Sequence, residues 1–121
     1  MESVPAAVQL ESIKSFQSTI RKSEKALAQM KEKGASTRLI EKRLQAFDIG
    51  LAVLETVWHE KPNSYSKEEM TEARDVLAGL LPSIESMHTK AEPGSPQRTL
   101  LERRIKSMEL AIEAMDDFLR D

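Results

Sequence analysis

Residues 39–58 have the sequence LIEKRLQAFDIGLAVLETVW, the strongest helical pattern in the chain. Apolar side chains recur in this stretch at steps of four and three, a spacing that places them along one face of an α-helix. They are Ile40, Leu44, Phe47, Leu51, Leu54 and Trp58. Ser36 or Thr37 is the candidate N-cap, because its hydroxyl would accept a hydrogen bond from a free backbone N–H. The segment 61–64, which contains a proline, is expected to end this helix.

Three further segments show the same helical spacing, at residues 10–30, 70–87 and 101–119. The connections between the four segments are short. Four helices of roughly 20–30 residues joined in this way predict an all-α protein, folded as a four-helix up-down-up-down bundle with coiled-coil-like packing.

Residues that begin and end helices separate these segments. Gly34 is a natural helix stop, residues 66–69 (Ser-Lys-Glu-Glu) form a capping box, and residues 95–96 (Ser-Pro) are suited to a helix start. Pro82 lies inside the third segment, where it predicts a kink or a break near residues 79–81. These local signals therefore predict most of the helix boundaries.

The composition limits the class of protein. The chain has 121 residues, of which 40% are hydrophobic, 31% charged and 4% aromatic, which is enough for one helical domain spanning 1–121. Residues 1–16 lack the basic start and the continuous apolar stretch of a secretory signal, and no apolar run is long enough to span a bilayer. The chain also has no cysteine. We therefore expect an intracellular protein, cytoplasmic or else nuclear, without a transmembrane segment.

An internal repeat is the most specific feature of the sequence. Residues 39–44 (LIEKRL) match residues 100–105 (LLERRI), with every position identical or conservatively changed. Residues 10–27 align more loosely with 70–87, at a separation of 60. These matches predict two tandem, duplicated helical hairpins at about 1–60 and 61–121. Heptad spacing alone is the alternative explanation, although it does not account for the matching charges.

A second stripe of small and apolar residues runs along the second and fourth predicted helices. Small residues four positions apart allow two helix backbones to approach closely. The stripe is either a diagonal contact inside one bundle or the seam of a homodimer, and the sequence leaves both open. Its residues are Leu39, Ala46, Gly50, Val53, Leu100, Ser107, Ala111 and Phe118.

The charges are arranged in blocks that nearly cancel in the net charge of −2. Residues 14–43 sum to +6 and residues 98–106 to +3, whereas residues 48–92 sum to −5 and residues 109–121 to −4. In an up-down-up-down bundle the basic blocks would meet at one end. This basic end is either a solvated surface or a docking site for an acidic partner, formed by Arg38, Lys42, Arg43, Arg98, Arg103 and Arg104.

No pattern in the sequence indicates catalysis. The two histidines, His59 and His88, are expected to lie far apart, and the predicted core stripes carry no metal-ligand pairs. There is no glycine-rich phosphate loop and no Ser/His/Asp arrangement. We therefore expect no enzymatic activity, no cofactor, no bound metal and no small-molecule substrate.

Three stretches resemble the N-terminal helical region of insect BEL/Pao-type retrotransposon Gag-like proteins. They are residues 20–25 (IRKSEK), 36–44 (STRLIEKRL) and 54–58 (LETVW), so the resemblance covers roughly residues 10–87. In that family a lysine-rich helix leads into an Arg-Leu helix that ends near a tryptophan. The resemblance implies a role in self-assembly or scaffolding without catalysis.

The sequence therefore predicts a protein–protein interaction or self-association module, with another protein or a second copy of the chain as its partner. The alternative is a peripheral binder of an acidic ligand, either an anionic lipid or a nucleic acid, through the basic end. Nucleic acid is the less favoured of these, because no aromatic residue lies among the basic ones to stack on bases.

Overall fold

The computed structural model describes residues 3–120 and confirms an all-α chain of four helices. No strand occurs within these residues. The helices are α1 (Ala6–Glu32), α2 (Arg38–His59), α3 (Lys67–Lys90) and α4 (Pro96–Leu119).

Local hydrogen bonds define the starts of α3 and α4, as the sequence predicts. The Ser66 hydroxyl accepts from the Glu69 backbone N–H at 3.1 Å, and the Glu69 carboxylate accepts from the Ser66 backbone N–H at 3.0 Å. At the start of α4, the Ser95 hydroxyl accepts from the Arg98 backbone N–H at 3.1 Å, and Pro96 occupies the first helical position. Each cap satisfies backbone donors that have no partner within the helix.

Two local expectations differ from the structure. Thr37 is the N-cap residue of α2, but its side chain makes no capping hydrogen bond, and its ψ of 1° departs from the extended values at Ser66 and Ser95. Of the kink or break expected near residues 79–81, the break is absent, since α3 continues through Pro82 to Lys90. Leu80, Leu81 and Ile84 pack against the core on either side of the proline. This tertiary packing stabilises the helix across the missing hydrogen bond.

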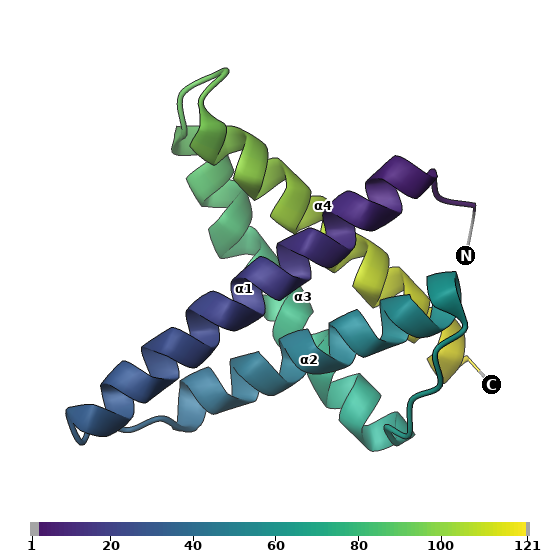
Figure 1. The fold of residues 1–121 in the computed structure, drawn as a ribbon, viewed down its shortest axis with the longest axis horizontal. Helices are drawn as coiled ribbons and strands as arrows, with labels where there is room; N and C mark the ends of the chain where they lie inside the picture. The colour runs from purple at the N-terminus through teal and green to yellow at the C-terminus, as the bar shows by residue number, and fades with distance from the viewer. Residues whose placement is uncertain (1–2, 121) are drawn as a thin grey trace.

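The four helices form two hairpins that cross each other (Figure 1). The α1–α2 tip and the α3–α4 tip diverge on one side of the crossing. Each helix packs against its neighbours in the order α1, α2, α3, α4 and back to α1, and α2 also contacts α4 across the diagonal. Within the described chain the backbones of α1 and α3 do not approach each other. The α1/α4 and α2/α3 contacts therefore lie on opposite sides of the molecule.

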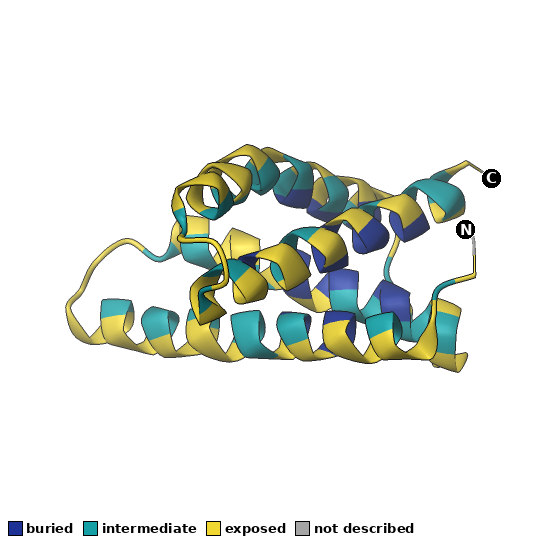
Figure 2. Ribbon diagram, turned by 90° about the horizontal axis from the view of Figure 1, so that it is seen from above, coloured by how far each residue is buried: buried dark blue, intermediate teal, exposed yellow. Residues whose placement is uncertain are grey.

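The core lies at the crossing of the hairpins, and both tips are largely exposed (Figure 2). No residue from 17 to 45 is buried, and Leu101 is the one buried residue of the described chain between 78 and 106. The largest fully buried side chains include Phe16 of α1, Leu77 of α3 and Met115 of α4. Much of the burial that stabilises each hairpin therefore lies where the two hairpins meet.

The same positions are buried in both hairpins. The buried residues of α2, at 46, 47, 49, 50, 53 and 54, recur 61 positions later in α4, at 107, 108, 110, 111, 114 and 115. Buried Ser12 and Phe16 of α1 recur with the same separation as Ala73 and Leu77 of α3. The separation of 60 expected for α1 and α3 is thus wrong by one residue. The burial pattern of the first hairpin is therefore largely repeated in the second.

Candidate functional site

Five of the six basic residues predicted to form one patch lie in two separate groups. Lys42 of α2 faces α3, where its Nζ is 3.8 Å from Glu72 Oε1. Arg103 of α4 faces α1, where its Nη2 is 3.7 Å from Glu11 Oε1. Arg38 and Arg43 accompany Lys42 at the start of α2. The structure does not bring these residues together at one end, because the hairpins cross and carry the starts of α2 and α4 apart (Figure 1).

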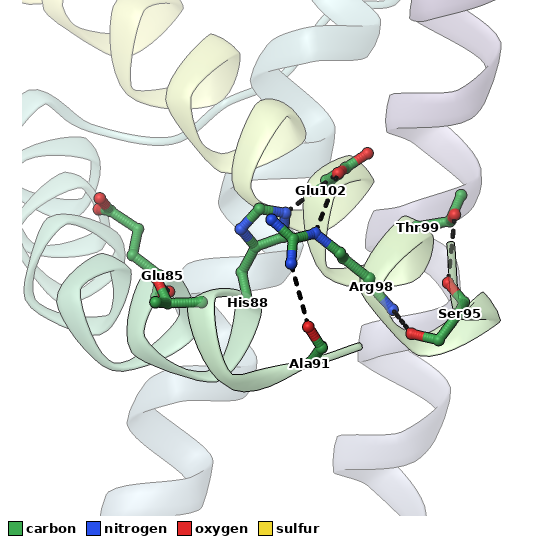
Figure 3. A network of polar contacts seen from close by, with 8 residues as sticks. Glu85, His88, Ala91, Ser95, Arg98, Thr99 and Glu102 are labelled. Atoms are coloured by element: carbon green, nitrogen blue, oxygen red, sulfur yellow. Dashed lines mark hydrogen bonds and ion pairs between the residues drawn. The ribbon is translucent and has the colours of Figure 1, made fainter. Parts of the chain in front are cut away.

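Arg98 belongs to neither group, because it holds the α3–α4 connection (Figure 3). Its Nη1 donates to the Ala91 carbonyl oxygen at 3.0 Å, and its Nε is 3.9 Å from Glu102 Oε1. His88 Nε2 lies 3.1 Å from the same Glu102 oxygen. Sequence reasoning missed this cluster, since His88 and Glu102 are joined only when α3 and α4 fold back on each other.

A groove lies between the first half of α1 and the start of α4. Its volume is about 690 Å³. We refer to it as the α1/α4 groove. Two leucines line it, Leu10 and Leu100, each with 54% of its surface exposed. The remaining lining residues are Ala7, Glu11, Lys14, Ser15, Gln17, Ser18, Arg21, Arg103 and Arg104.

The α1/α4 groove is strongly basic. Four cationic side chains line it, against the single carboxylate of Glu11. Arg104 is the most enclosed cation: burial lowers the pKa of its guanidinium, and its buried Nε has no hydrogen-bond partner among the described residues. A buried donor without a partner is destabilising.

A smaller groove of about 220 Å³ lies on the opposite side, between α2 and α3. We refer to it as the α2/α3 groove. Leu39, Lys42 and Arg43 line it, each 61 positions before Leu100, Arg103 and Arg104 of the larger groove. Asp75, Val76, Gly79 and Leu80 complete its lining. The two grooves are therefore equivalent positions on the two hairpins.

The predicted small-residue stripe is buried in its middle and exposed at its ends. Ala46, Gly50, Val53, Ser107 and Ala111 are buried within the single chain. Leu39, Leu100 and Phe118 are exposed, and the first two lie at the grooves. α2 contacts α4 across the diagonal, and Gly50 of the stripe also lies against Phe16 of α1 and Leu77 of α3.

Metal-binding and membrane-spanning features are absent from residues 3–120. No group of three His, Cys, Asp or Glu side chains in this range is placed to hold a metal ion. None of the described helices combines the length and the apolar character needed to cross a membrane. The two grooves, each lined by an exposed leucine and by cations, are candidate binding sites.

Comparison of the chain with known protein families, with curated proteins and with solved structures finds no match. The resemblance to the BEL/Pao-type Gag-like region therefore stays a hypothesis.

Proposed function

We propose that this chain is a non-enzymatic protein-interaction module whose α1/α4 groove takes an acidic helical segment of a partner protein. The observation that carries the proposal is the pairing of exposed Leu10 and Leu100 with four cations in one groove. Burying a leucine side chain fully contributes about 1.5–3 kcal/mol. Two half-exposed leucines therefore offer a useful part of that energy to a ligand.

The charge of the groove supports an acidic partner. Opposite charge speeds diffusional encounter and rejects basic competitors. An amphipathic helix that places apolar side chains between acidic ones would meet both the leucines and the cations.

In the second form of this proposal, the partner that enters the groove is another copy of the chain. α4 carries acidic side chains in its last turns, at Glu109, Glu113, Asp116 and Asp117, so one molecule could present an acidic helix to another. Light scattering on the purified chain at several concentrations and at low and high salt separates the two forms.

Binding of an anionic lipid or a nucleic acid is supported less well. The basic groups at the starts of α2 and α4 face opposite sides, so a flat membrane could contact only one of them. No aromatic side chain lines either groove to stack on a base.

A fluorescent peptide tests the proposal directly. The probe is a helix-forming peptide of about 15 residues. Its leucines are spaced three or four positions apart along one face, and its glutamates lie beside that face. Titration with the full chain should give saturable anisotropy that weakens as salt rises from about 50 to about 500 mM. Leu100→Ser and Lys14→Glu should each weaken binding about tenfold, equivalent to roughly 1.4 kcal/mol.

Matched variants outside the groove serve as controls. Met87→Ser removes a similarly exposed apolar side chain, 46% exposed, from α3, and Lys25→Glu reverses an exposed charge on α1 outside the groove. Both should bind the probe as the natural chain does. Equal losses in groove and control variants, or binding to anionic vesicles but not to the peptide, would overturn the proposal.

A further inference from the structure

An exposed motif recurs in the two hairpins, although core packing does not require it. Leu39 and Leu100 occupy equivalent positions, 61 residues apart, and are 60% and 54% exposed. Lys42 and Arg43 recur in the same way as Arg103 and Arg104. A buried position that recurs is explained by the core. Core packing does not explain why an exposed leucine recurs.

Ion pairs between the hairpins explain part of the motif. The ion pair Lys42–Glu72 is equivalent to the ion pair Arg103–Glu11. Lys42 lies 61 positions before Arg103, and Glu11 lies 61 positions before Glu72. These surface pairs join the hairpins and give Lys42 and Arg103 a structural role, although exposed pairs contribute little stability. Nothing in the described chain covers Leu39 or Leu100, so their recurrence points to a ligand.

We propose that the chain is bivalent: the α1/α4 and α2/α3 grooves each bind one acidic helical segment of the same chemical class. This inference rests on the proposed function and extends it from one site to two. Each groove offers a leucine followed by two cations at the start of the second helix of its hairpin. Because the grooves lie on opposite sides, the chain would hold two partner segments apart.

The two sites differ in strength. Lys14 in the α1/α4 groove corresponds to Asp75 in the α2/α3 groove, and Arg21 corresponds to Pro82. The larger groove therefore has two additional cations, while the smaller one has an acidic side chain that repels a carboxylate. We expect the α1/α4 groove to bind an acidic segment more tightly than the α2/α3 groove.

Calorimetric titration with the leucine–glutamate peptide tests bivalency. The natural chain should bind two peptides, one tightly and one weakly. Leu100→Ser should remove the tight site and leave the weak one, whereas Leu39→Ser should do the opposite. Met87→Ser should still bind two. Circular dichroism checks that each variant is folded, and Leu39→Ala or Leu100→Ala replaces any serine variant that is not.

Exchanging the charges at Lys14 and Asp75 tests which groove binds the peptide more tightly. Asp75→Lys should give the α2/α3 groove the cation that Lys14 supplies to the other, and should tighten the weak site about tenfold. Lys14→Asp should weaken the tight site by a similar factor. These variants change affinity at one site without changing the number of sites.

The outcomes separate this inference from the proposed function. A single site that Leu100→Ser destroys and Leu39→Ser leaves unchanged would overturn bivalency while the proposed function stands. If the peptide binds at neither groove, both bivalency and the proposed function are overturned. Two sites that survive both leucine substitutions, or self-association of the chain through these leucines, would show that the grooves are not paired docking sites for a partner segment.

Discussion

Gly50 shows, at the level of single residues, how closely α2 packs against α1 and α3. A Cβ atom at this position would lie 2.9 Å from Cε1 of Phe16 and 3.3 Å from Cδ1 of Leu77. Phe16 cannot easily retreat, since it is 2% exposed and its ring packs edge-on against Phe47 at a centroid distance of 6.4 Å. The residue equivalent to Gly50 in α4 is Ala111, and the residue equivalent to Phe16 in α3 is Leu77. The missing side chain at position 50 makes room for the ring of Phe16, which is larger than the side chain of leucine.

Gly50→Ala is predicted to destabilise the fold in spite of its better helix propensity. The propensity gain is about 1 kcal/mol, and overpacking a core costs about 1–3 kcal/mol. We expect a net loss of about 1 kcal/mol in the free energy of unfolding, measured by urea denaturation. Adding Phe16→Leu should recover part of the loss, because the shorter side chain leaves the Cβ atom free. A higher free energy of unfolding for Gly50→Ala than for the natural chain would contradict this account.

At the level of the helix, α3 shows that tertiary packing can override a local signal. Pro82 lacks the N–H that would donate to the carbonyl of residue 78, yet the helix continues to Lys90. Its equivalent in α1 is Arg21, in the middle of an uninterrupted helix. The packed side chains of Leu81 and Ile84 hold α3 together where the hydrogen bond is missing.

Replacing Pro82 by alanine is predicted to stabilise the protein. The restored hydrogen bond and the removed steric clash should outweigh the greater entropy of the unfolded chain. We expect the free energy of unfolding to rise by about 2 kcal/mol in urea denaturation. Ser83→Ala at the adjacent exposed position is the control, with a gain below about 0.5 kcal/mol from propensity alone. Equal effects of the two substitutions would mean that the proline adds no strain.

At the level of the whole molecule, stability depends on the crossing of the two hairpins. α2 contacts α4 across the diagonal, and the tips contribute almost no buried side chains. A single hairpin would leave its apolar face in water, and isolated helical segments are marginal without such packing.

Separate peptides of residues 1–63 and 64–121 are predicted to be poorly helical. Each would lack the partner that covers its buried positions. Mixing them in equal amounts should restore helical circular dichroism and give a one-to-one complex in light scattering. A fragment that unfolds cooperatively on its own would show that one hairpin holds a sufficient core by itself.

Helical spacing and capping residues made much of this architecture predictable. The apolar stripe of residues 40–58, the capping box at residues 66–69 and the Ser-Pro start of α4 all depend on local interactions, so the sequence predicted them. Thr37 was predicted as a cap, but its hydroxyl makes no capping bond because the backbone there adopts a different conformation. The exposed motif that recurs at Leu39 and Leu100 was also visible as a sequence repeat.

By itself, the sequence determined the number of helices, most of their ends and which faces are apolar. These properties depend on neighbours within a few turns of the same helix. Only the tertiary structure decided that Lys42 meets Glu72 and Arg103 meets Glu11 on opposite sides. It also decided that Leu10 and Leu100 line one groove. Helical spacing specifies which face of a helix is buried, but not the angle at which two hairpins cross, and that angle distributes the charges and forms the grooves.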